Sequence, residues 1–255
     1  MTAVLETDRL SLRFGGVSAL TDVSIQIEEK SLHAIIGPNG AGKTSFFNCL
    51  TGFYRPTSGA VRFKGSDVSG LEAAKVAALG VRRTFQNIRV FPKMSVLENV
   101  LAGAHLRATA NLLSITVASP KFRRTERLLH DEAMSSLEFV GLAGQWNSLA
   151  GDLPYGMRKR MELARVLIAD PVVVLLDEPA AGVSSVERKE LSRVIQRIHG
   201  RGTCVVMIEH DVELVMEIAT TVTVLDNGRT IATGLPQDVR LNPAVIRAYM
   251  GRERK

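Results

Sequence analysis

Residues 37–44 carry the densest chemistry in the chain and read Gly-Pro-Asn-Gly-Ala-Gly-Lys-Thr. They match the phosphate-binding pattern G-x-x-x-x-G-K-[ST] without a substitution. Glycines permit a tight turn whose backbone N–H groups point at phosphate oxygens, and a helix N-terminus adds partial positive charge. In such a loop Lys43 reaches the β- and γ-phosphates and the Thr44 hydroxyl holds Mg²⁺.

The residues on either side of this loop have the character that phosphate binding requires. Residues 32–36 are short, apolar and rich in β-branched side chains, which predicts a buried strand. Residues 45–50 contain no helix breaker, which predicts a helix. A glycine-rich turn without a ligand is the alternative, and the strand–loop–helix context favours the phosphate loop.

Acidic residues follow a second apolar run. Asp177 and Glu178 come directly after residues 172–176, which read as a central parallel strand. Ligands of open α/β sheets bind at the carboxyl ends of such strands. We therefore expect Asp177 to support Mg²⁺ through its water and Glu178 to polarise an attacking water. His210 follows residues 204–208 in the same way. Two interpretations of His210 are therefore open: a contact with the γ-phosphate, or a surface or capping role.

The start of another predicted helix offers an anion site. Residues 153–157 read Leu-Pro-Tyr-Gly-Met, and Met157, Met161, Ala164 and Ile168 recur at helical spacing. The first N–H groups of this helix and its dipole favour an anion. Every helix start has these properties, so this signal is weak alone.

Composition narrows the class of protein. Of the 255 residues, 45% are hydrophobic and 23% charged, as in soluble globular proteins. No apolar run approaches the ~18–20 residues that cross a bilayer, and the N-terminus does not resemble a signal peptide. Cys49 and Cys204 lie in apolar segments and are expected to be buried free thiols in the cytoplasm. A net charge of +6 is compatible with nucleic acid, but the aromatic residues do not interleave with the basic clusters.

The segments between the motifs predict an α/β protein with a helical insertion. The first thirty residues alternate polar and apolar side chains, which indicates antiparallel strands. The runs 172–176 and 204–208, with a helical pattern between them, form a predicted β-α-β unit. Residues 96–141 are rich in helix formers and charges, and within them residues 109–120 read either as a loop or as a short helix.

Taken in their order along the chain, the motifs resemble those of the ATP-binding cassette (ABC) ATPases over essentially the whole chain. The resemblance implies the α/β P-loop fold of that family: a mostly parallel RecA-like core, an antiparallel β-subdomain and an inserted α-helical subdomain. It implies one ABC ATPase domain over residues 1–255. Residues 1–88 and 160–255 would form the core with the β-subdomain, and residues 89–159 the helical signature subdomain.

The resemblance also implies a role for each site residue. Glu178, His210 (the switch histidine), Lys43 and Gln86 (the glutamine loop) would be catalytic. Thr44, Gln86 and Asp177 would hold the metal. Nucleotide would be bound by Phe14, which stacks on adenine, and by Gly37, Pro38, Asn39, Gly40, Ala41, Gly42, Lys43, Thr44, Ser45 and Asp177. The partner's nucleotide would be contacted in trans by Leu153, Pro154, Tyr155, Gly156 and Met157.

A closer resemblance is to the ATPase subunits of branched-chain amino acid importers of the LivG type. It rests on residues 51–59, 83–88, 95–100, 177–182 and 242–249. It implies the cofactors ATP and Mg²⁺ and a second ABC ATPase in a homo- or heterodimer. It also implies two permease subunits, indirectly a periplasmic solute-binding protein, and no nucleic acid. The subunit would lie peripherally at the cytoplasmic face of the inner membrane.

The sequence departs from the general ABC pattern in three ways. Pro154 and Tyr155 replace the serine and first glycine of the signature, and Met157 replaces its glutamine. Ser184 stands where the family has an aspartate that crosses the dimer. The serine hydroxyl that contacts the γ-phosphate of the opposing ATP is therefore missing. We expect the ATP site that this signature completes to be slower than its partner.

The predicted function is an ATP-binding and ATP-hydrolysing subunit that powers import of branched-chain amino acids or related small solutes. Two alternatives within the family are the ATPase of a lipid or polysaccharide exporter and a regulatory cassette with weak hydrolysis. A third is a soluble cassette protein acting on ribosomes or DNA. Proteins of that kind normally carry two cassettes or a long coiled-coil insertion, and the sequence shows neither.

Overall fold

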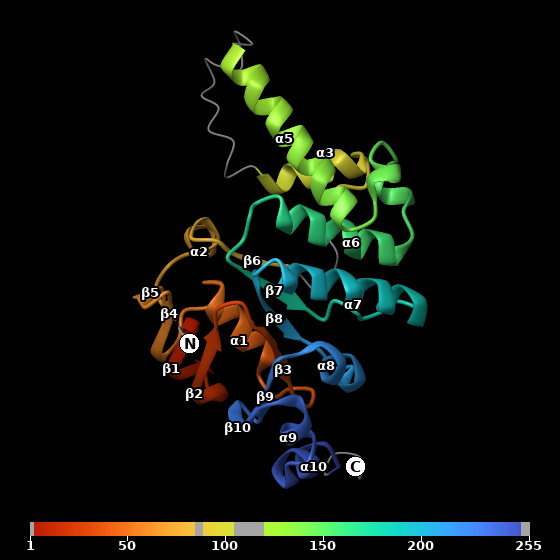
Figure 1. The fold of residues 1–255 in the computed structure, drawn as a ribbon. Helices are drawn as coiled ribbons and strands as arrows, with labels where there is room; N and C mark the ends of the chain where they lie inside the picture. Colours follow the sequence, from red (N-terminus) through yellow and green to blue (C-terminus); the bar gives the residue numbers. More distant parts are fainter. Residues whose placement is uncertain (1–2, 85–88, 105–119, 251–255) are drawn as a thin grey trace. The chain divides into compact units, whose positions relative to one another are not determined.

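The computed structural model describes residues 3–84, 89–104 and 120–250, and Figure 1 shows its helices and strands. The chain divides into two compact units. The core unit comprises Met1–Arg83, Val172–Ala181 and Ile195–Lys255. The helical unit comprises Thr84–Pro171 and Gly182–Val194. The boundaries at residues 89 and 159 were expected from the family resemblance. They stay a prediction, because the two compact units are not the family's subdomains by definition.

A six-stranded sheet forms the centre of the core unit. Its order is β10-β9-β3-β8-β7-β6, and all neighbours are parallel except β10 and β9. Its strands are β3 (Leu32–Ile36), β6 (Val81–Arg83), β7 (Val173–Asp177), β8 (Cys204–Ile208), β9 (Thr221–Asp226) and β10 (Arg229–Gly234). Every residue of β3, β7 and β8 is buried, which explains why these segments read as continuous apolar runs.

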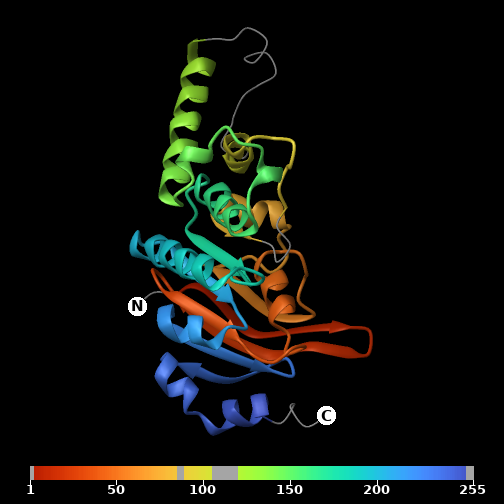
Figure 2. The same ribbon diagram turned by 90° about the vertical axis from the view of Figure 1, so that its right-hand side faces the viewer.

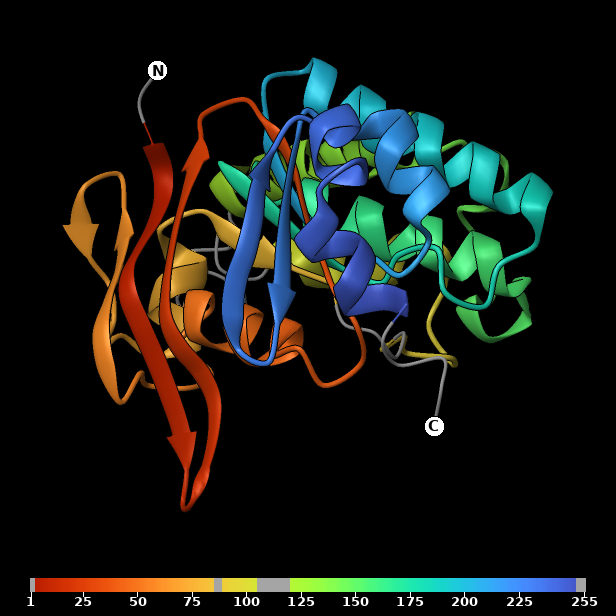
Figure 3. The ribbon, with the colours of Figure 1, turned by 90° about the horizontal axis from the view of Figure 1, so that it is seen from below.

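A second, antiparallel sheet has the order β2-β1-β4-β5. Its strands are β1 (Ala3–Phe14), β2 (Val17–Glu28), β4 (Ser58–Phe63) and β5 (Ser66–Asp67), and Figure 3 shows the long hairpin of β1 and β2. Leu10 and Leu12 are buried, and Arg13, expected on the opposite face of the strand, is exposed, as the alternation predicts. These sheets confirm the predicted fold class.

Helix α1 (Lys43–Leu50) joins the two sheets through one hydrophobic core. Its Phe46 and Phe47 are fully buried in the same cluster as β1, β2, β3 and β7 residues. The other core helices are α2 (Ala73–Ala78), α8 (Val212–Ile218), α9 (Pro236–Arg240) and α10 (Pro243–Met250). Within the described residues, none of the helices combines the length and the apolar character needed to span a membrane.

The helical unit contains α3 (Val96–Leu101), α5 (Pro120–Phe139), α6 (Tyr155–Leu167) and the first part of α7 (Ser185–Gly200). Short 3₁₀ turns lie at Ala102–Ala104, Ala143–Gln145 and Ala150–Asp152. Ser95 and Glu98 cap α3 reciprocally. Helices α3 and α6 both contact α5, whose Ala133 and Leu137 are buried. Figure 2 shows the length of α5. By sequence, residues 109–120 read as either a loop or a short helix; Pro120 begins α5, and residues 109–119 lie outside the described residues.

Candidate functional site

The phosphate loop connects β3 to α1, as its flanking residues predict. Gly37 has a φ of 148°, and Gly42, at the N-cap of α1, has a φ of 100°. A Cβ on Gly37 would lie 2.0 Å from the carbonyl oxygen of Leu225, and one on Gly42 would lie 2.6 Å from that of Ala19. Backbone conformation and the nearness of other backbone therefore both require glycine at these two positions.

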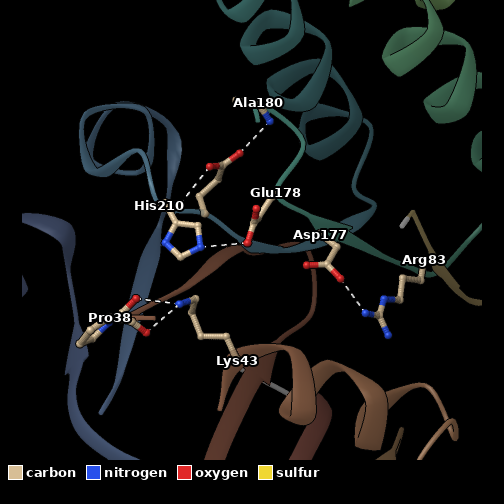
Figure 4. A network of polar contacts seen from close by, with 9 residues as sticks. Pro38, Lys43, Arg83, Asp177, Glu178, Ala180 and His210 are labelled. Carbon is tan, nitrogen blue, oxygen red and sulfur yellow. Dashed lines mark hydrogen bonds and ion pairs between the residues drawn. The ribbon is translucent and has the colours of Figure 1, made fainter. Parts of the chain in front are cut away.

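Lys43 lies against the beginning of its own loop. Its Nζ donates hydrogen bonds to the carbonyl oxygens of Gly37 at 2.7 Å and Pro38 at 3.1 Å, and Figure 4 shows both contacts. The side chain is only 6% exposed. The loop itself thus orients the ammonium group, because two of its carbonyl oxygens point at the charge.

The two predicted catalytic residues after β7 and β8 are paired. Nε2 of His210 lies 2.9 Å from Oε1 of Glu178. Glu178 has a φ of 48°, and its N–H donates to the carbonyl oxygen of Ile208 at 3.0 Å. A positive φ is uncommon outside glycine and persists where surrounding contacts fix the backbone. Here the bond to Ile208 and the bond to His210 fix both ends of Glu178.

Glu209 connects His210 to the loop that follows Glu178, a role that sequence reasoning missed. Its Oε1 accepts a hydrogen bond from the N–H of Ala180 at 2.8 Å, and its Oε2 accepts one from the N–H of His210 at 3.1 Å. Burial raises the pKa of Glu209, although these N–H groups oppose the rise by stabilising the carboxylate. The carboxylate holds two backbone segments of the site together.

Asp177, at the end of β7, is paired with Arg83 at the end of the neighbouring strand β6. Nη2 of Arg83 lies 2.6 Å from Oδ2 of Asp177, and the side chains are 7% and 4% exposed. In the sequence analysis Arg83 had no role of its own; it was only part of residues 83–88, which resemble the LivG type. Adjacent parallel strands end at the same edge of a sheet, so the topology could have suggested the pair only once β6 was known to neighbour β7.

A cavity of about 340 Å³ opens over the phosphate loop. Seven of the predicted nucleotide-binding residues line it: Asn39, Gly40, Ala41, Gly42, Lys43, Thr44 and Ser45. Glu178 and His210 line it as well, together with Val17, Ser18 and Ala19 of β2. Those three residues were not predicted to line the site. They follow Phe14, the predicted adenine-stacking residue, closely in the sequence, and that closeness could have indicated them. The size suits a small ligand, and the loop supplies groups that suit phosphate.

A larger groove of about 640 Å³ lies away from the phosphate loop in the core unit. Three carboxylates, Glu6, Asp8 and Glu28, line it with His33. Like charges repel, so this groove is unsuitable for a nucleotide's phosphates. We therefore assign the candidate nucleotide site to the smaller cavity.

Several predicted site residues lie outside the cavity lining. Phe14 is 48% exposed, and its ring meets that of Tyr54 edge-on with centroids 5.2 Å apart. Gly37, Pro38 and Asp177 adjoin residues of the site without lining the cavity. Gln86 lies outside the described residues, so its catalytic and metal-binding roles stay predictions.

The signature residues are held at the start of α6 in the helical unit. Pro154 is the N-cap, Leu153 is buried and Tyr155 is half-exposed. The N–H of Gly156 donates to Oε1 of Glu187 at 3.2 Å. The same helix start that was predicted to attract an anion thus contacts a carboxylate of its own chain.

The other oxygen of Glu187 is also engaged. Ser184 donates to Oε2 through its N–H at 2.9 Å and through its Oγ at 2.7 Å. The N–H of Glu187 in turn donates to Ser184 Oγ at 3.3 Å, the reciprocal pattern of a capping box. Ser184, the third departure from the ABC pattern, therefore caps α7.

A mostly parallel sheet with a phosphate loop after a central strand, and a carboxylate–histidine pair facing that loop, defines a P-loop nucleoside triphosphatase. Residues 20–181 match the family model described as ABC transporter. Residues 229–255 match the model described as branched-chain amino acid ATP-binding cassette transporter. The chain belongs to the ABC transporter family of ATPases, whose general function is ATP hydrolysis coupled to transport.

Curated relatives and solved structures agree with this assignment. The chain is 43% identical to the high-affinity branched-chain amino acid transport ATP-binding protein BraF of Pseudomonas aeruginosa, covering 97% of this chain and 98% of the relative. It is 41% identical to LivG of Escherichia coli with the same coverage. An ATP-binding cassette of an ABC transporter in its ADP conformation superposes with a TM-score of 0.86 at 30% identity, covering 99% of this chain and 100% of that one.

Proposed function

We propose that this protein is the ATP-hydrolysing subunit of an importer for branched-chain amino acids or related small solutes. The observation that carries the ATPase part is the cavity in which the phosphate loop meets Glu178 and His210. The solute class is supported by the C-terminal match over residues 229–255 and by the names of the BraF and LivG relatives.

The proposed chemistry is in-line transfer of the γ-phosphoryl group of ATP to water. Lys43 and the loop N–H groups bind the phosphates. Glu178 accepts a hydrogen bond from the attacking water, whose oxygen bonds to the γ-phosphorus as the bond to the ADP oxygen breaks. His210 orients the Glu178 carboxylate through their 2.9 Å contact and faces the same cavity. Positioning and charge neutralisation supply most of the rate enhancement in this reaction class.

The residues predicted to hold Mg²⁺ suit that ion. The Thr44 hydroxyl and the Asp177 carboxylate are oxygen donors, which Mg²⁺ prefers. Among the described residues, no three or more His, Cys, Asp and Glu side chains gather into a metal cluster. A site with few protein ligands that shares the ion with substrate phosphates is in keeping with this. When bound, the ion neutralises charge on the β- and γ-phosphates.

The assembly around this subunit follows from the family's architecture. Two cassettes would close head-to-tail on ATP, each lending residues 153–157 to the other's site. Hydrolysis would reopen the pair, and the helical unit would pass that motion to two permease subunits. The subunit would work peripherally at the cytoplasmic face of the membrane, with a periplasmic binding protein delivering solute and no nucleic acid involved.

Solute uptake by the native host tests the whole proposal. Deletion of the gene should abolish high-affinity uptake of labelled leucine, isoleucine or valine. Wild-type protein should restore uptake, and the Glu178→Gln protein should not, because it lacks the carboxylate that orients water. Unchanged amino acid uptake with a loss of surface lipid or polysaccharide would instead support the exporter alternative. Full restoration by Glu178→Gln would support the regulatory alternative.

A further inference from the structure

We propose that Arg83 is a positioning residue for the metal site: it fixes the orientation of the Asp177 carboxylate so that Mg²⁺·ATP binds productively. The inference rests on the proposed function, in which Asp177 supports Mg²⁺. It adds a residue from β6 to a site whose other described parts are the phosphate loop, α1, β2 and the ends of β7 and β8. Figure 4 shows Arg83 and Asp177 facing each other beside Glu178.

The two residues contact each other directly, and their side chains are almost completely shielded from solvent. Nη2 of Arg83 lies 2.6 Å from Oδ2 of Asp177. Both side chains are more than nine-tenths buried. A hydrogen bond between two charged groups is short, strong and directional, and burial shields it from water. One oxygen of the carboxylate is therefore fixed in place, and this sets the direction in which the whole group points.

Arg83 can orient Asp177 because the guanidinium is itself immobilised from the other side. Its Nη1 donates to Oδ1 of Asn48 at 2.6 Å and to Oγ1 of Thr51 at 3.4 Å, both at the end of α1. The guanidinium carbon lies 5.6 Å from the ring centroid of Phe47. The phosphate loop begins the same helix, so Arg83 ties the end of β7 to the helix that carries Lys43 and Thr44.

Only an arginine can make both sets of contacts. Its planar fork presents one nitrogen to Asp177 and another to Asn48, whereas a lysine is a single point charge on a flexible stem. Arg83→Lys keeps the positive charge beside Asp177 and loses the fork. The substitution thus separates orientation from charge, which makes it the informative variant.

The alternative is that the pair serves only to stabilise the fold. Buried ion pairs often contribute little net stability, because desolvation offsets the attraction, but removal of one partner is strongly destabilising. A purely structural role predicts a lower melting temperature in Arg83 variants with unchanged metal affinity in the molecules that remain folded. A positioning role predicts weaker metal binding in folded protein. Metal affinity and stability must therefore be measured on the same samples.

The test uses the full-length protein and Mn²⁺ as a spectroscopic substitute for Mg²⁺. Electron paramagnetic resonance titration with a non-hydrolysable ATP analogue gives the Mn²⁺ affinity, and a fluorescent ATP analogue in EDTA gives metal-free nucleotide affinity. We expect Arg83→Lys to weaken Mn²⁺ binding by about ten- to a hundredfold, the range for residues that orient metal ligands. Metal-free nucleotide affinity should stay within about twofold, because Lys43 and the loop remain intact.

Arg82→Lys is the matched control. Arg82 is the preceding residue of β6, so its side chain leaves the opposite face of the strand, and it forms no ion pair in the part of the chain that the structure describes. Its Mn²⁺ affinity should equal that of the wild type. Arg83→Met serves as a second variant if it stays folded by circular dichroism, and it should weaken Mn²⁺ binding at least as much.

The outcomes separate the inference from the proposed function. If wild-type protein binds the ATP analogue without any dependence on Mn²⁺, or if Asp177→Asn binds Mn²⁺ as the wild type does, the metal-site assignment fails. If wild-type protein shows metal-dependent binding that Asp177→Asn abolishes, but folded Arg83→Lys retains full Mn²⁺ affinity, only the positioning role of Arg83 is wrong. A loss of metal-free nucleotide binding in Arg83→Lys would also overturn it, in favour of a structural role.

Discussion

His210 and Glu178 are hydrogen-bonded to each other, with 2.9 Å between Nε2 and Oε1, although 32 positions separate them in the chain. The His210 side chain is 44% exposed and the Glu178 side chain 14% exposed, so the carboxylate is the more buried of the two. The pair faces the cavity above the phosphate loop. Each residue therefore contributes to the placement of the other, and their substitutions should interact.

Glu178→Gln should retain ATP binding and nearly stop hydrolysis. Glutamine keeps the shape of the side chain and loses the negative charge that orients and polarises water. Phosphate release and a sizing column with ATP measure the two effects, and a trapped dimer is expected on the column. Glu213→Gln, on the exposed side of α8, is the control and should hydrolyse ATP normally. Normal hydrolysis by Glu178→Gln would show that another group activates the water.

His210→Ala should lose most turnover while nucleotide affinity remains. The double variant with Glu178→Gln should be little slower than Glu178→Gln alone, because residues that act as a unit are strongly non-additive. Single-turnover hydrolysis of all four proteins completes the cycle. Additive losses in the logarithm of the rate would mean that the two residues act independently despite their contact.

Lys43→Ala should abolish ATP hydrolysis, because it removes the point charge on the β- and γ-phosphates. It also frees the carbonyl oxygens of Gly37 and Pro38 from their hydrogen-bond donor. Nucleotide affinity and turnover should both be measured. Lys75→Ala, at an exposed position of α2, should behave as the wild type. Unchanged turnover in Lys43→Ala would refute the assignment of the phosphate loop.

Acid should destabilise the protein through His33 of β3. Its Nε2 lies 2.9 Å from Thr223 Oγ1, and burial lowers the pKa of His33 from 6.5 to about 4. Between these values the unfolded chain binds a proton at His33 and the folded protein does not. The free energy of unfolding therefore falls as pH drops from about 6.5 to about 4. At about 1.4 kcal/mol per pKa unit, the contribution of His33 is roughly 3 kcal/mol.

Urea unfolding at several pH values measures this dependence. His33→Gln keeps a side-chain donor for Thr223 and should flatten the profile over that pH range. His130→Gln is the control, since the His130 side chain is about half exposed and the substitution should leave the profile unchanged. A His33→Gln profile as steep as that of the wild type would place the acid sensitivity elsewhere.

Met157→Gln should raise the ATPase activity of the mixed ATPase pair and barely affect this chain alone. The signature acts in trans, so a restored polar group would contact the partner's nucleotide. One hydrogen bond to a charged group is worth roughly 1.5–3 kcal/mol, which corresponds to about tenfold or more in rate if it forms in the transition state. Pro154→Ser is the companion variant, although proline also presets the first turn of α6. If neither variant changed the ATPase rate of the mixed pair, the departures from the signature at Pro154 and Met157 would have no effect on activity.

Local chemistry made the phosphate loop predictable. Its glycines, lysine and flanking apolar strand are contiguous, so residues 32–50 show the strand, the loop and the helix without knowledge of the rest of the fold. The carboxylate after β7 and the histidine after β8 were predictable because both strands are buried on both faces and read as apolar runs.

Contacts between distant segments could not be read in the same way. Arg83 meets Asp177 only because β6 neighbours β7, and Glu209 meets Ala180 only because β8 neighbours β7. The order of strands in a sheet is not encoded in any local pattern. The lining contributed by Val17, Ser18 and Ala19 also depends on how the antiparallel sheet lies over the loop, although the nearness of these residues to Phe14 in the sequence hinted at it.

The position of β3 in the sheet has a consequence for biosynthesis. Residues 32–36 leave the ribosome early, but their two neighbours are β8 and β9, at residues 204–208 and 221–226. At about 5–20 residues per second, the ribosome needs on the order of 10 to 30 s to supply the first of them. The nascent chain holds an apolar strand with both edges open throughout that time, which makes it a candidate for chaperone binding. The strand that precedes the phosphate loop thus gains its neighbours only late in translation, although residues 37–44 of the predicted nucleotide site are made early.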